Sequence, residues 1–141
     1  GTKLSTSQAP GVIAGYGVGL DMTLRDVQSA AKQKGLPWAV AKGFDTSAPV
    51  SEFVPASVAG PAPVFDIECR VNGAVRQSTS TAAMVFDVAR LVSYISTVFT
   101  LEAGDLIFTG TPEGVGPVRP GDTIEAILAG HATTRHTVVA A

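Results

Sequence analysis

Residues 65–79 read Phe-Asp-Ile-Glu-Cys-Arg-Val-Asn-Gly-Ala-Val-Arg-Gln-Ser-Thr. Between Phe65 and Val71, apolar residues alternate with charged ones, which is the pattern of a strand buried on one face. Asn72-Gly73 is the dipeptide favoured in a type I′ turn, and residues 74–79 can return as a second strand. The stretch therefore predicts a β-hairpin, with Cys69 packed on its buried face.

The rest of the chain adds further strands and two helices. A second hairpin is expected near the C-terminus, from residues 123–128 and 133–139 around Gly130, and residues 106–109 resemble a short apolar strand. Prolines make residues 43–63 a predicted loop. Because strands outnumber helices and do not alternate with them, we expect an α+β, mainly-β domain.

Two helices are predicted from capping residues and apolar spacing. The first is expected from Leu24 to Lys34, with Thr23 as N-cap and Asp26 completing an acidic variant of the capping box. Gly35 should end it. The second is expected at about residues 82–98, where apolar residues recur every three or four positions and indicate one buried face.

Composition excludes several classes of protein. The 141 residues are 45% hydrophobic and 16% charged, which is unlike an intrinsically disordered chain. A net charge of -2 disfavours nucleic acid and acidic membranes as partners, and no apolar run approaches the roughly 20 residues of a membrane span. Cys69 is the only cysteine, so no intramolecular disulfide can form and a reducing compartment, the cytoplasm, is expected.

Polar residues of the first predicted helix form a candidate binding stripe. Asp21, Arg25, Gln28 and Lys32 are spaced by four, three and four residues. Such a stripe can be a solvated face. Asp21, however, ends a very apolar, glycine-rich segment, and Arg25 and Gln28 are suitable donors for a carboxylate or a carbonyl oxygen.

Lys42 lies in an apolar setting, between Trp38 and Phe44. A buried lysine needs a partner or a depressed pKa, and either condition suits a functional site. The alternative is a lysine whose stem lies along apolar surface at a strand end while its charge stays in water.

Residues 109–117, Thr-Gly-Thr-Pro-Glu-Gly-Val-Gly-Pro, form the second candidate site. Short residues with free backbone N–H groups and hydroxyls can hold a small anion, although a tight connecting loop explains the same composition. A P-loop is excluded because no Gly-Lys-Ser/Thr ends the string, and the spacing after Gly15-x-Gly17 does not fit a dinucleotide-binding turn. His131 and His136 are expected at the surface.

Two strings in these regions resemble the fumarylacetoacetate hydrolase family. They are Asp-x-Thr-x-Arg-Asp-x-Gln at residues 21–28 and Thr-Gly-Thr-Pro-x-Gly-Val-Gly at residues 109–116. Residues 35–45, with Gly-Leu-Pro-Trp-Ala-Val-Ala-Lys-Gly-Phe-Asp, match between them, and residues 71–77 match through Val-Asn-Gly and Arg-Gln. The likeness is strongest to the small single-domain members, the acylpyruvases and the oxaloacetate decarboxylases or tautomerases.

The resemblance implies a mixed β-roll fold, a homodimer and a divalent metal, Mg²⁺ or Mn²⁺, held by three carboxylates. Asp21 matches one metal ligand. Gln28 and Lys42 match residues that contact the substrate near the metal, and we expect both to act in catalysis. Arg25 is expected to bind the substrate as a further donor. Gly110 and Thr111 match the loop that binds the substrate carboxylate. The implied substrates are small 2-keto acids, and the implied chemistry stabilises an enolate at the keto oxygen.

The sequence departs from the family pattern at its N-terminal side. Family members carry a Glu-x-Glu pair and a His and Glu dyad there, and neither is present. Asp66 and Glu68 have the right spacing but belong to the first hairpin. We therefore expect residues 1–141 to be a single catalytic domain lacking its N-terminal portion, with two further carboxylate ligands upstream of Gly1.

Three functions stay open at this point. Hydrolysis of acylpyruvates or other 2,4-diketo acids, with C–C bond cleavage, is the leading hypothesis. Decarboxylation or keto–enol tautomerisation of oxaloacetate could use the same site. A non-catalytic remnant that binds a partner or a small acid is the alternative of another class. Both enzymatic hypotheses predict that four residues converge on one cavity: Asp21, Gln28, Lys42 and Thr111.

Overall fold

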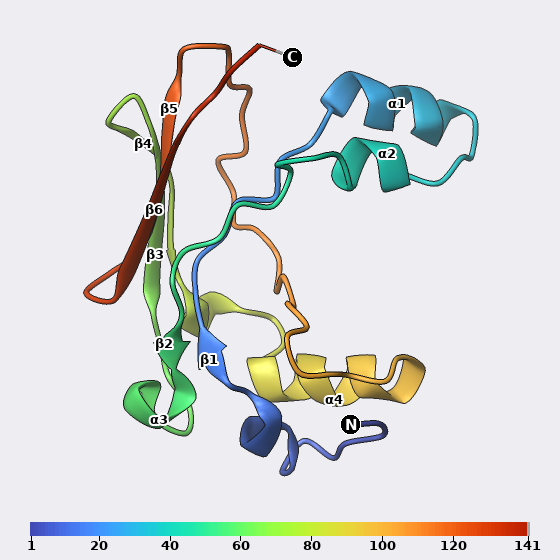
Figure 1. The fold of residues 1–141 in the computed structure, drawn as a ribbon, viewed down its shortest axis with the longest axis vertical. Helices are drawn as coiled ribbons and strands as arrows, with labels where there is room; N and C mark the ends of the chain where they lie inside the picture. Colours follow the sequence, from blue (N-terminus) through green and yellow to red (C-terminus); the bar gives the residue numbers. More distant parts are fainter. Residues whose placement is uncertain (141) are drawn as a thin grey trace.

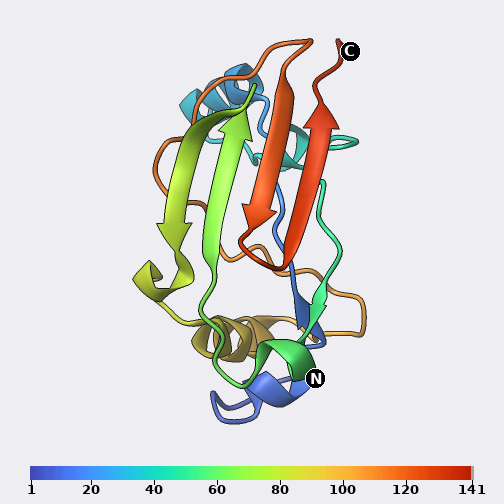
Figure 2. The ribbon, with the colours of Figure 1, turned by 90° about the vertical axis from the view of Figure 1, so that its left-hand side faces the viewer.

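The structure is a computed structural model that describes residues 1–140. A four-stranded antiparallel sheet forms one side of the molecule, and helices project from both of its ends (Figures 1 and 2). The helical elements are η1 (Ala9–Val12), α1 (Arg25–Gln33), α2 (Ala39–Lys42), α3 (Ala56–Ala59), η2 (Thr81–Ala83) and α4 (Val88–Val98). The strands are β1 (Gly15–Tyr16), β2 (Val54–Pro55), β3 (Asp66–Val71), β4 (Ala74–Ser80), β5 (Thr123–Leu128) and β6 (Ala132–Thr137). The expected α+β, mainly-β class is confirmed.

Both predicted hairpins are present in the main sheet, whose strand order is β4-β3-β5-β6. Asn72 and Gly73 join β3 to β4 with φ angles of 52° and 80°, as a type I′ turn requires. The β5–β6 hairpin pairs Thr123 with Thr137 and Leu128 with Ala132. β5 also pairs with β3, and Cys69 lies opposite Ala126. This pairing joins segments more than 50 residues apart in the sequence.

The core lies against the inner face of this sheet. Ile124, Ala126 and Leu128 of β5 all point inward and are at most 4% exposed. Leu20 packs on Ile124 and Ala126, and Cys69 lies beside them, partly buried as predicted. Burying a side chain such as Ile124 contributes about 1.5–3 kcal/mol, so this contact holds the segment before Asp21 firmly to the sheet.

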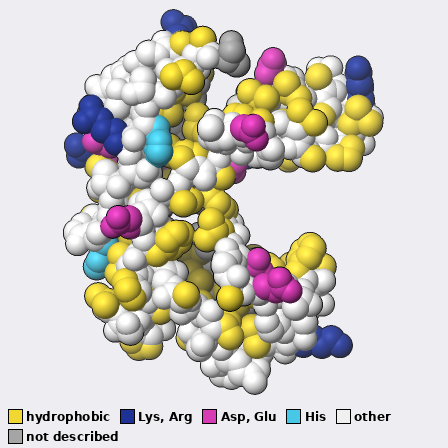
Figure 3. Space-filling view, viewed as in Figure 1, with side chains coloured by type: hydrophobic (Ala, Val, Ile, Leu, Met, Phe, Trp, Pro, Cys, Tyr) yellow, Lys and Arg dark blue, Asp and Glu magenta, His cyan; other side chains and the backbone are white. Residues whose placement is uncertain are grey.

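An extended ladder carries the chain from the sheet to α1 and α2. The N–H groups of Leu20, Met22 and Leu24 donate to the carbonyl oxygens of Pro49, Ser47 and Ala41, at 2.9, 2.8 and 3.1 Å. In Figure 1 the two segments run together toward the α1–α2 pair, while α4 lies at the opposite end of the sheet. Figure 3 shows a broad recess between these two ends. The ladder therefore places Asp21 between the main sheet and the α1–α2 pair.

Four local predictions were wrong. Thr23 does not cap α1: Leu24 occupies the cap position without a side-chain bond, and the Thr23 hydroxyl donates to the Asp21 carbonyl oxygen at 3.5 Å. α4 begins only at Val88, because Asp87 accepts a hydrogen bond from the N–H of Arg90 at 2.7 Å. The expected loop at 43–63 contains β2 and α3, and residues 106–109 form no strand.

A turn beside β5 holds one carboxylate with a shifted pKa. Asp122 accepts from the Asn72 amide at 2.8 Å and from the N–H of Arg119 at 2.7 Å. These two hydrogen bonds hold the pKa of Asp122 below its ordinary value, and the bond from Asn72 has the larger effect. The lowered pKa adds stability above the pKa of an unfolded aspartate, and this contribution is lost as the pH falls through the folded value.

Asp122→Ala is therefore expected to lower the melting temperature at pH 7. The loss should shrink as the pH falls below about 4, because protonation then removes the same contribution from the wild type. Thermal unfolding followed by circular dichroism from pH 7 to pH 3 measures the difference. Asp45→Ala, at an exposed position, is the control and should change the melting temperature little. An Asp122→Ala loss that is constant with pH would contradict the prediction.

Candidate functional site

Asp21 and Lys42 form the centre of the candidate site. The ladder fixes the backbone on both sides of Asp21, through the N–H groups of Leu20 and Met22. Lys42 is the last residue of α2, and its Nζ donates to Oδ2 of Asp21 at 2.7 Å. The lysine therefore has a charged partner 21 positions away, and it ends a short helix rather than a strand.

This ion pair is open to a small molecule. The Asp21 side chain is 48% exposed and that of Lys42 is 36% exposed. A pair with this exposure contributes about 0–1 kcal/mol to stability, because water screens both charges. Its contribution to the fold is small, and both groups can exchange partners when a ligand with its own charge or a cation arrives.

Arg25 and Gln28 lie one turn apart on α1. Nη1 of Arg25 donates to Oε1 of Gln28 at 2.7 Å. The carbonyl of Gln28 is thus engaged, while its NH₂ group can donate elsewhere. Asp21 precedes α1 and does not belong to a helical stripe, so the stripe contains only Arg25, Gln28 and Lys32. Arg25 and Gln28 together present hydrogen-bond donors beside the ladder.

The loop of residues 109–117 lies on β4. Gly110 and Gly114 have φ angles of 112° and 95°, a left-handed conformation that favours glycine. A Cβ at Gly114 would lie 2.0 Å from the carbonyl oxygen of Arg76, so the loop backbone touches the strand. Thr111 is exposed, and its hydroxyl accepts from Nε2 of Gln77 at 2.9 Å. The loop therefore has a defined shape and presents Thr111 outward.

The ladder that carries Asp21 runs beside the segment that leads into the loop of residues 109–117, the Thr111 loop. A Cβ at Gly19 would lie 2.9 Å from the ring of Phe108, which places a residue two before Asp21 against one three before Thr111. Figure 1 shows the same proximity of the two segments. Within residues 1–140, however, no hydrogen bond joins Thr111 to Asp21, Lys42 or Gln28. Their convergence on one cavity stays a prediction.

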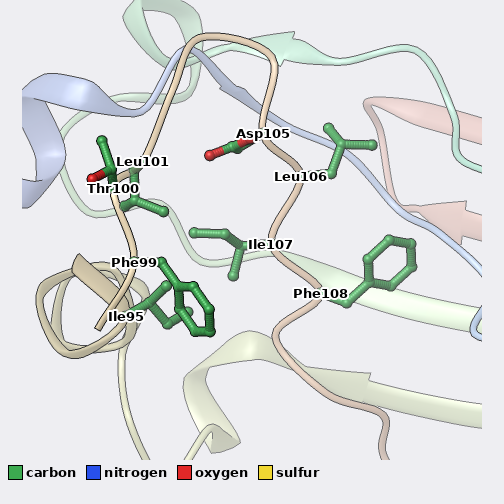
Figure 4. A pocket seen from close by; sticks show the side chains of 8 residues that line it. All are labelled: Ile95, Phe99, Thr100, Leu101, Asp105, Leu106, Ile107 and Phe108. Carbon is green, nitrogen blue, oxygen red and sulfur yellow. The ribbon is translucent and has the colours of Figure 1, made fainter. Parts of the chain in front are cut away.

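One cavity lies elsewhere, against α4. It has a volume of about 510 Å³, and Ile95, Phe99, Leu101 and residues 105–108 line it (Figure 4). None of the predicted site residues belongs to its wall. A smaller cavity lies at Glu68 and Arg70 on the main sheet and also contains none of them.

The carboxylates of this chain do not complete a metal site. Among residues 1–140, no three His, Cys, Asp or Glu side chains are grouped so that they could hold an ion. Asp66 and Glu68 alternate with inward residues of β3, and Glu68 pairs with Arg70, so they do not supplement Asp21. Mg²⁺ needs several oxygen ligands, and Asp21 alone provides too few.

Sequence reasoning included Gln77 in the family match but gave it no role, although it is the residue that holds the Thr111 loop. Its Nε2 also donates to the carbonyl oxygen of Pro112 at 2.8 Å. A regular two-residue turn at Asn72-Gly73 would pair Gln77 with Glu68, but a register shift between Cys69 and Arg70 places it opposite Cys69, on the inward face of β4. A polar residue on a buried face needs partners, and the loop provides them. The two histidines are exposed, as expected.

None of the helices in the described part of the chain is long and apolar enough to cross a membrane.

Comparison with known proteins identifies several relatives. A mitochondrial oxaloacetate decarboxylase of Dictyostelium discoideum is 46% identical over 92% of this chain and 60% of its own length. A mitochondrial oxaloacetate tautomerase of Mus musculus is 45% identical over 98% of this chain and 62% of its own length. The chain thus spans about 60% of the length of these curated relatives.

Solved structures share the fold. A fumarylpyruvate hydrolase from Pseudomonas aeruginosa, in complex with Mn²⁺ and pyruvate, superposes with a TM-score of 0.95 at 40% identity, over 100% of this chain and 60% of that one. A 5-carboxymethyl-2-hydroxymuconate delta-isomerase from Mycobacterium smegmatis superposes with a TM-score of 0.87 at 36% identity, over 98% and 53%. The family model for the C-terminal region of fumarylacetoacetate (FAA) hydrolase matches residues 1–139. The chain therefore belongs to the fumarylacetoacetate hydrolase family.

Proposed function

We propose that this chain is the part of an enzyme for small 2-keto acids that provides Asp21, Arg25, Gln28, Lys42 and the Thr111 loop. The preferred reaction is tautomerisation or decarboxylation of oxaloacetate. The observation that carries the proposal is the half-exposed pair of Lys42 and Asp21, 2.7 Å apart. The approach of Gly19 to Phe108, near Asp21 and the Thr111 loop in the sequence, supports a common site. The names of the relatives from Mus musculus and Dictyostelium discoideum support this choice of substrate.

The proposed roles follow from the charge that develops on a keto acid. The substrate carboxylate binds at the Thr111 hydroxyl and the N–H of Gly110. When a proton or carbon dioxide leaves the carbon beside the carbonyl, negative charge develops on the keto oxygen. The Lys42 ammonium stabilises that charge, and a fixed positive group is most effective at such a point. Arg25 and Gln28 orient the remaining polar groups of the substrate.

A divalent cation, Mg²⁺ or Mn²⁺, belongs to the proposal, and the Mn²⁺ bound to the Pseudomonas aeruginosa relative supports it. Asp21 is the residue of this chain that would hold it. When bound, such a cation polarises a carbonyl oxygen as a Lewis acid. Because Asp21 is a single ligand, the proposal takes from the family resemblance two further carboxylates outside residues 1–140.

Metal binding by the 141-residue chain alone is therefore expected to be weak. Calorimetric titration with Mg²⁺ and with Mn²⁺ should show no micromolar site, since one carboxylate cannot replace enough of the waters of the ion. Asp21→Asn is the matched control and should reduce whatever weak binding is present. Micromolar affinity, or turnover of a keto acid by this chain alone, would mean that these residues supply the missing ligands themselves.

Hydrolysis of acylpyruvates is the second candidate, favoured by the superposition on the fumarylpyruvate hydrolase. Three parallel assays of the full-length protein with Mn²⁺ separate the reactions: conversion of enol- to keto-oxaloacetate, release of carbon dioxide, and cleavage of an acylpyruvate. We expect the highest kcat/KM on oxaloacetate. Faster cleavage of the acylpyruvate would favour the hydrolase, and no turnover in any assay would favour a non-catalytic remnant.

A homodimer in the cytoplasm completes the proposal. The family resemblance supports the dimer, which light scattering on the purified protein can measure. The single cysteine, Cys69, supports a reducing compartment. Two of the relatives are mitochondrial by name, so imaging of the tagged protein in its own cells should compare both compartments.

A further inference from the structure

Gln77 connects the main sheet to the loop that presents Thr111. It lies on the inward face of β4, and its side chain is only partly exposed. Nε2 of Gln77 contacts two oxygen atoms, Oγ1 of Thr111 at 2.9 Å and the carbonyl oxygen of Pro112 at 2.8 Å. Both hydrogens of this amide are therefore used within one loop.

The chemistry of these partners fixes which way the amide points. The Pro112 carbonyl can only accept, so the atom beside it must be the NH₂ group of Gln77. The same group faces the Thr111 hydroxyl, which must therefore accept in that bond. A hydroxyl that accepts in one direction keeps its own hydrogen for a partner in another direction. A carboxylate, which only accepts, is suited to that hydrogen.

We infer that Gln77 is a positioning residue that makes Thr111 a hydrogen-bond donor to the carboxylate of the substrate. This inference rests on the proposed function, because it needs a carboxylate at Thr111. The loop is also seated on the neighbouring residue of β4, where Gly114 touches the carbonyl oxygen of Arg76. Gln77 can thus be changed while this second contact still holds the loop in place.

Two substitutions of Gln77 separate hydrogen-bond direction from loop anchoring. Gln77→Met removes both bonds and keeps the length of the side chain. Gln77→Glu places an acceptor at Thr111, which then turns its own hydrogen toward β4 and loses it for the ligand. The probe is pyruvate, and its dissociation constant is measured with the full-length protein in Mn²⁺ at pH 5 to 8. Methyl pyruvate, which lacks the carboxylate charge, is the comparison ligand.

At pH 7 Gln77→Glu is expected to weaken pyruvate binding about tenfold more than Gln77→Met does. The difference should shrink toward pH 5, as the new carboxyl takes up a proton and can donate. Methyl pyruvate should show a much smaller difference. Equal, pH-independent losses in both variants would reduce Gln77 to a loop anchor and overturn the inference.

The new charge of Gln77→Glu could also repel pyruvate directly, and a double-mutant cycle with Thr111→Val removes this ambiguity. Repulsion persists without the Thr111 hydroxyl, whereas the effect of hydrogen-bond direction disappears. We expect Gln77→Glu to cost about fivefold less in the Thr111→Val background than in the wild type. Equal costs in both backgrounds would overturn the inference.

The same measurements distinguish failure of the inference from failure of the proposed function. Pyruvate binding with the expected Gln77 pattern, but without turnover of oxaloacetate or acylpyruvates, would reject the reaction and keep the role of Gln77. Turnover of a keto acid, together with wild-type pyruvate affinity in both Gln77 variants, would support the reaction and reject the role of Gln77. A wild-type protein that does not bind pyruvate would overturn the inference, since no carboxylate would then reach Thr111.

Discussion

Lys42→Ala is expected to lower kcat on oxaloacetate by about 100- to 10,000-fold, the scale of losing one charged donor at a developing oxyanion. The lysine charge matters most when negative charge builds on the keto oxygen, so KM should change much less than kcat. Unfolding should not cause the loss, because the exposed pair with Asp21 contributes at most about 1 kcal/mol to stability. Steady-state kinetics of the full-length protein with Mn²⁺ measure both constants.

Two further variants make this prediction specific. Lys42→Arg should not restore kcat, because a planar guanidinium differs in shape from a compact ammonium. Lys34→Ala, at an exposed position after α1, is the matched control and should leave kcat and KM close to those of the wild type. A normal kcat with a raised KM in Lys42→Ala would show that the lysine only anchors the substrate.

The parts of the fold that could be predicted are those specified by neighbouring residues. Asn72 and Gly73 both adopt positive φ, so the first hairpin follows from two adjacent residues. α1 was predicted within one residue at each end: Gly35, with its positive φ, is a local stop signal, although the Thr23 cap used to predict the start is not formed. β5 was also predicted from local sequence, and every second residue of the strand is buried.

The errors come from contacts made by more distant parts of the chain. Residues 106–109 have the composition of a strand, but a strand needs neighbours for its backbone groups. Instead Phe108 packs on Gly19, and Leu106 and Ile107 line the cavity beside α4. Such packing partners lie many positions away and leave no mark in the local pattern.

The candidate site follows the same division. Its residues could be identified from their types and from the family resemblance, but their contacts could not. Asp21 meets Lys42 only because the ladder aligns the two segments, through bonds such as that from Met22 to Ser47. The role of Gln77 could not be predicted, because its partners, Thr111 and Pro112, belong to a loop more than 30 positions away.

Gly114→Ala is expected to lower the stability of the protein strongly. Two costs combine at this position: a φ of 95°, which L side chains rarely adopt, and a Cβ only 2.0 Å from the carbonyl oxygen of Arg76. The oxygen belongs to the backbone of β4 and cannot rotate away, so the loop itself must move. We expect the free energy of unfolding to fall by about 1–3 kcal/mol beyond the cost of the left-handed conformation alone. Urea unfolding measures this difference.

Gly121→Ala isolates the cost of the backbone conformation. Gly121 has a φ of 93°, nearly that of Gly114, but a Cβ there meets nothing within 4 Å. This control should lose only about 1 kcal/mol and keep its affinity for pyruvate. Gly114→Ala should also weaken pyruvate binding, because lifting the loop from Arg76 separates Thr111 from Gln77. Equal losses of stability in the two variants would show that the contact between Gly114 and Arg76 does not hold the loop on β4.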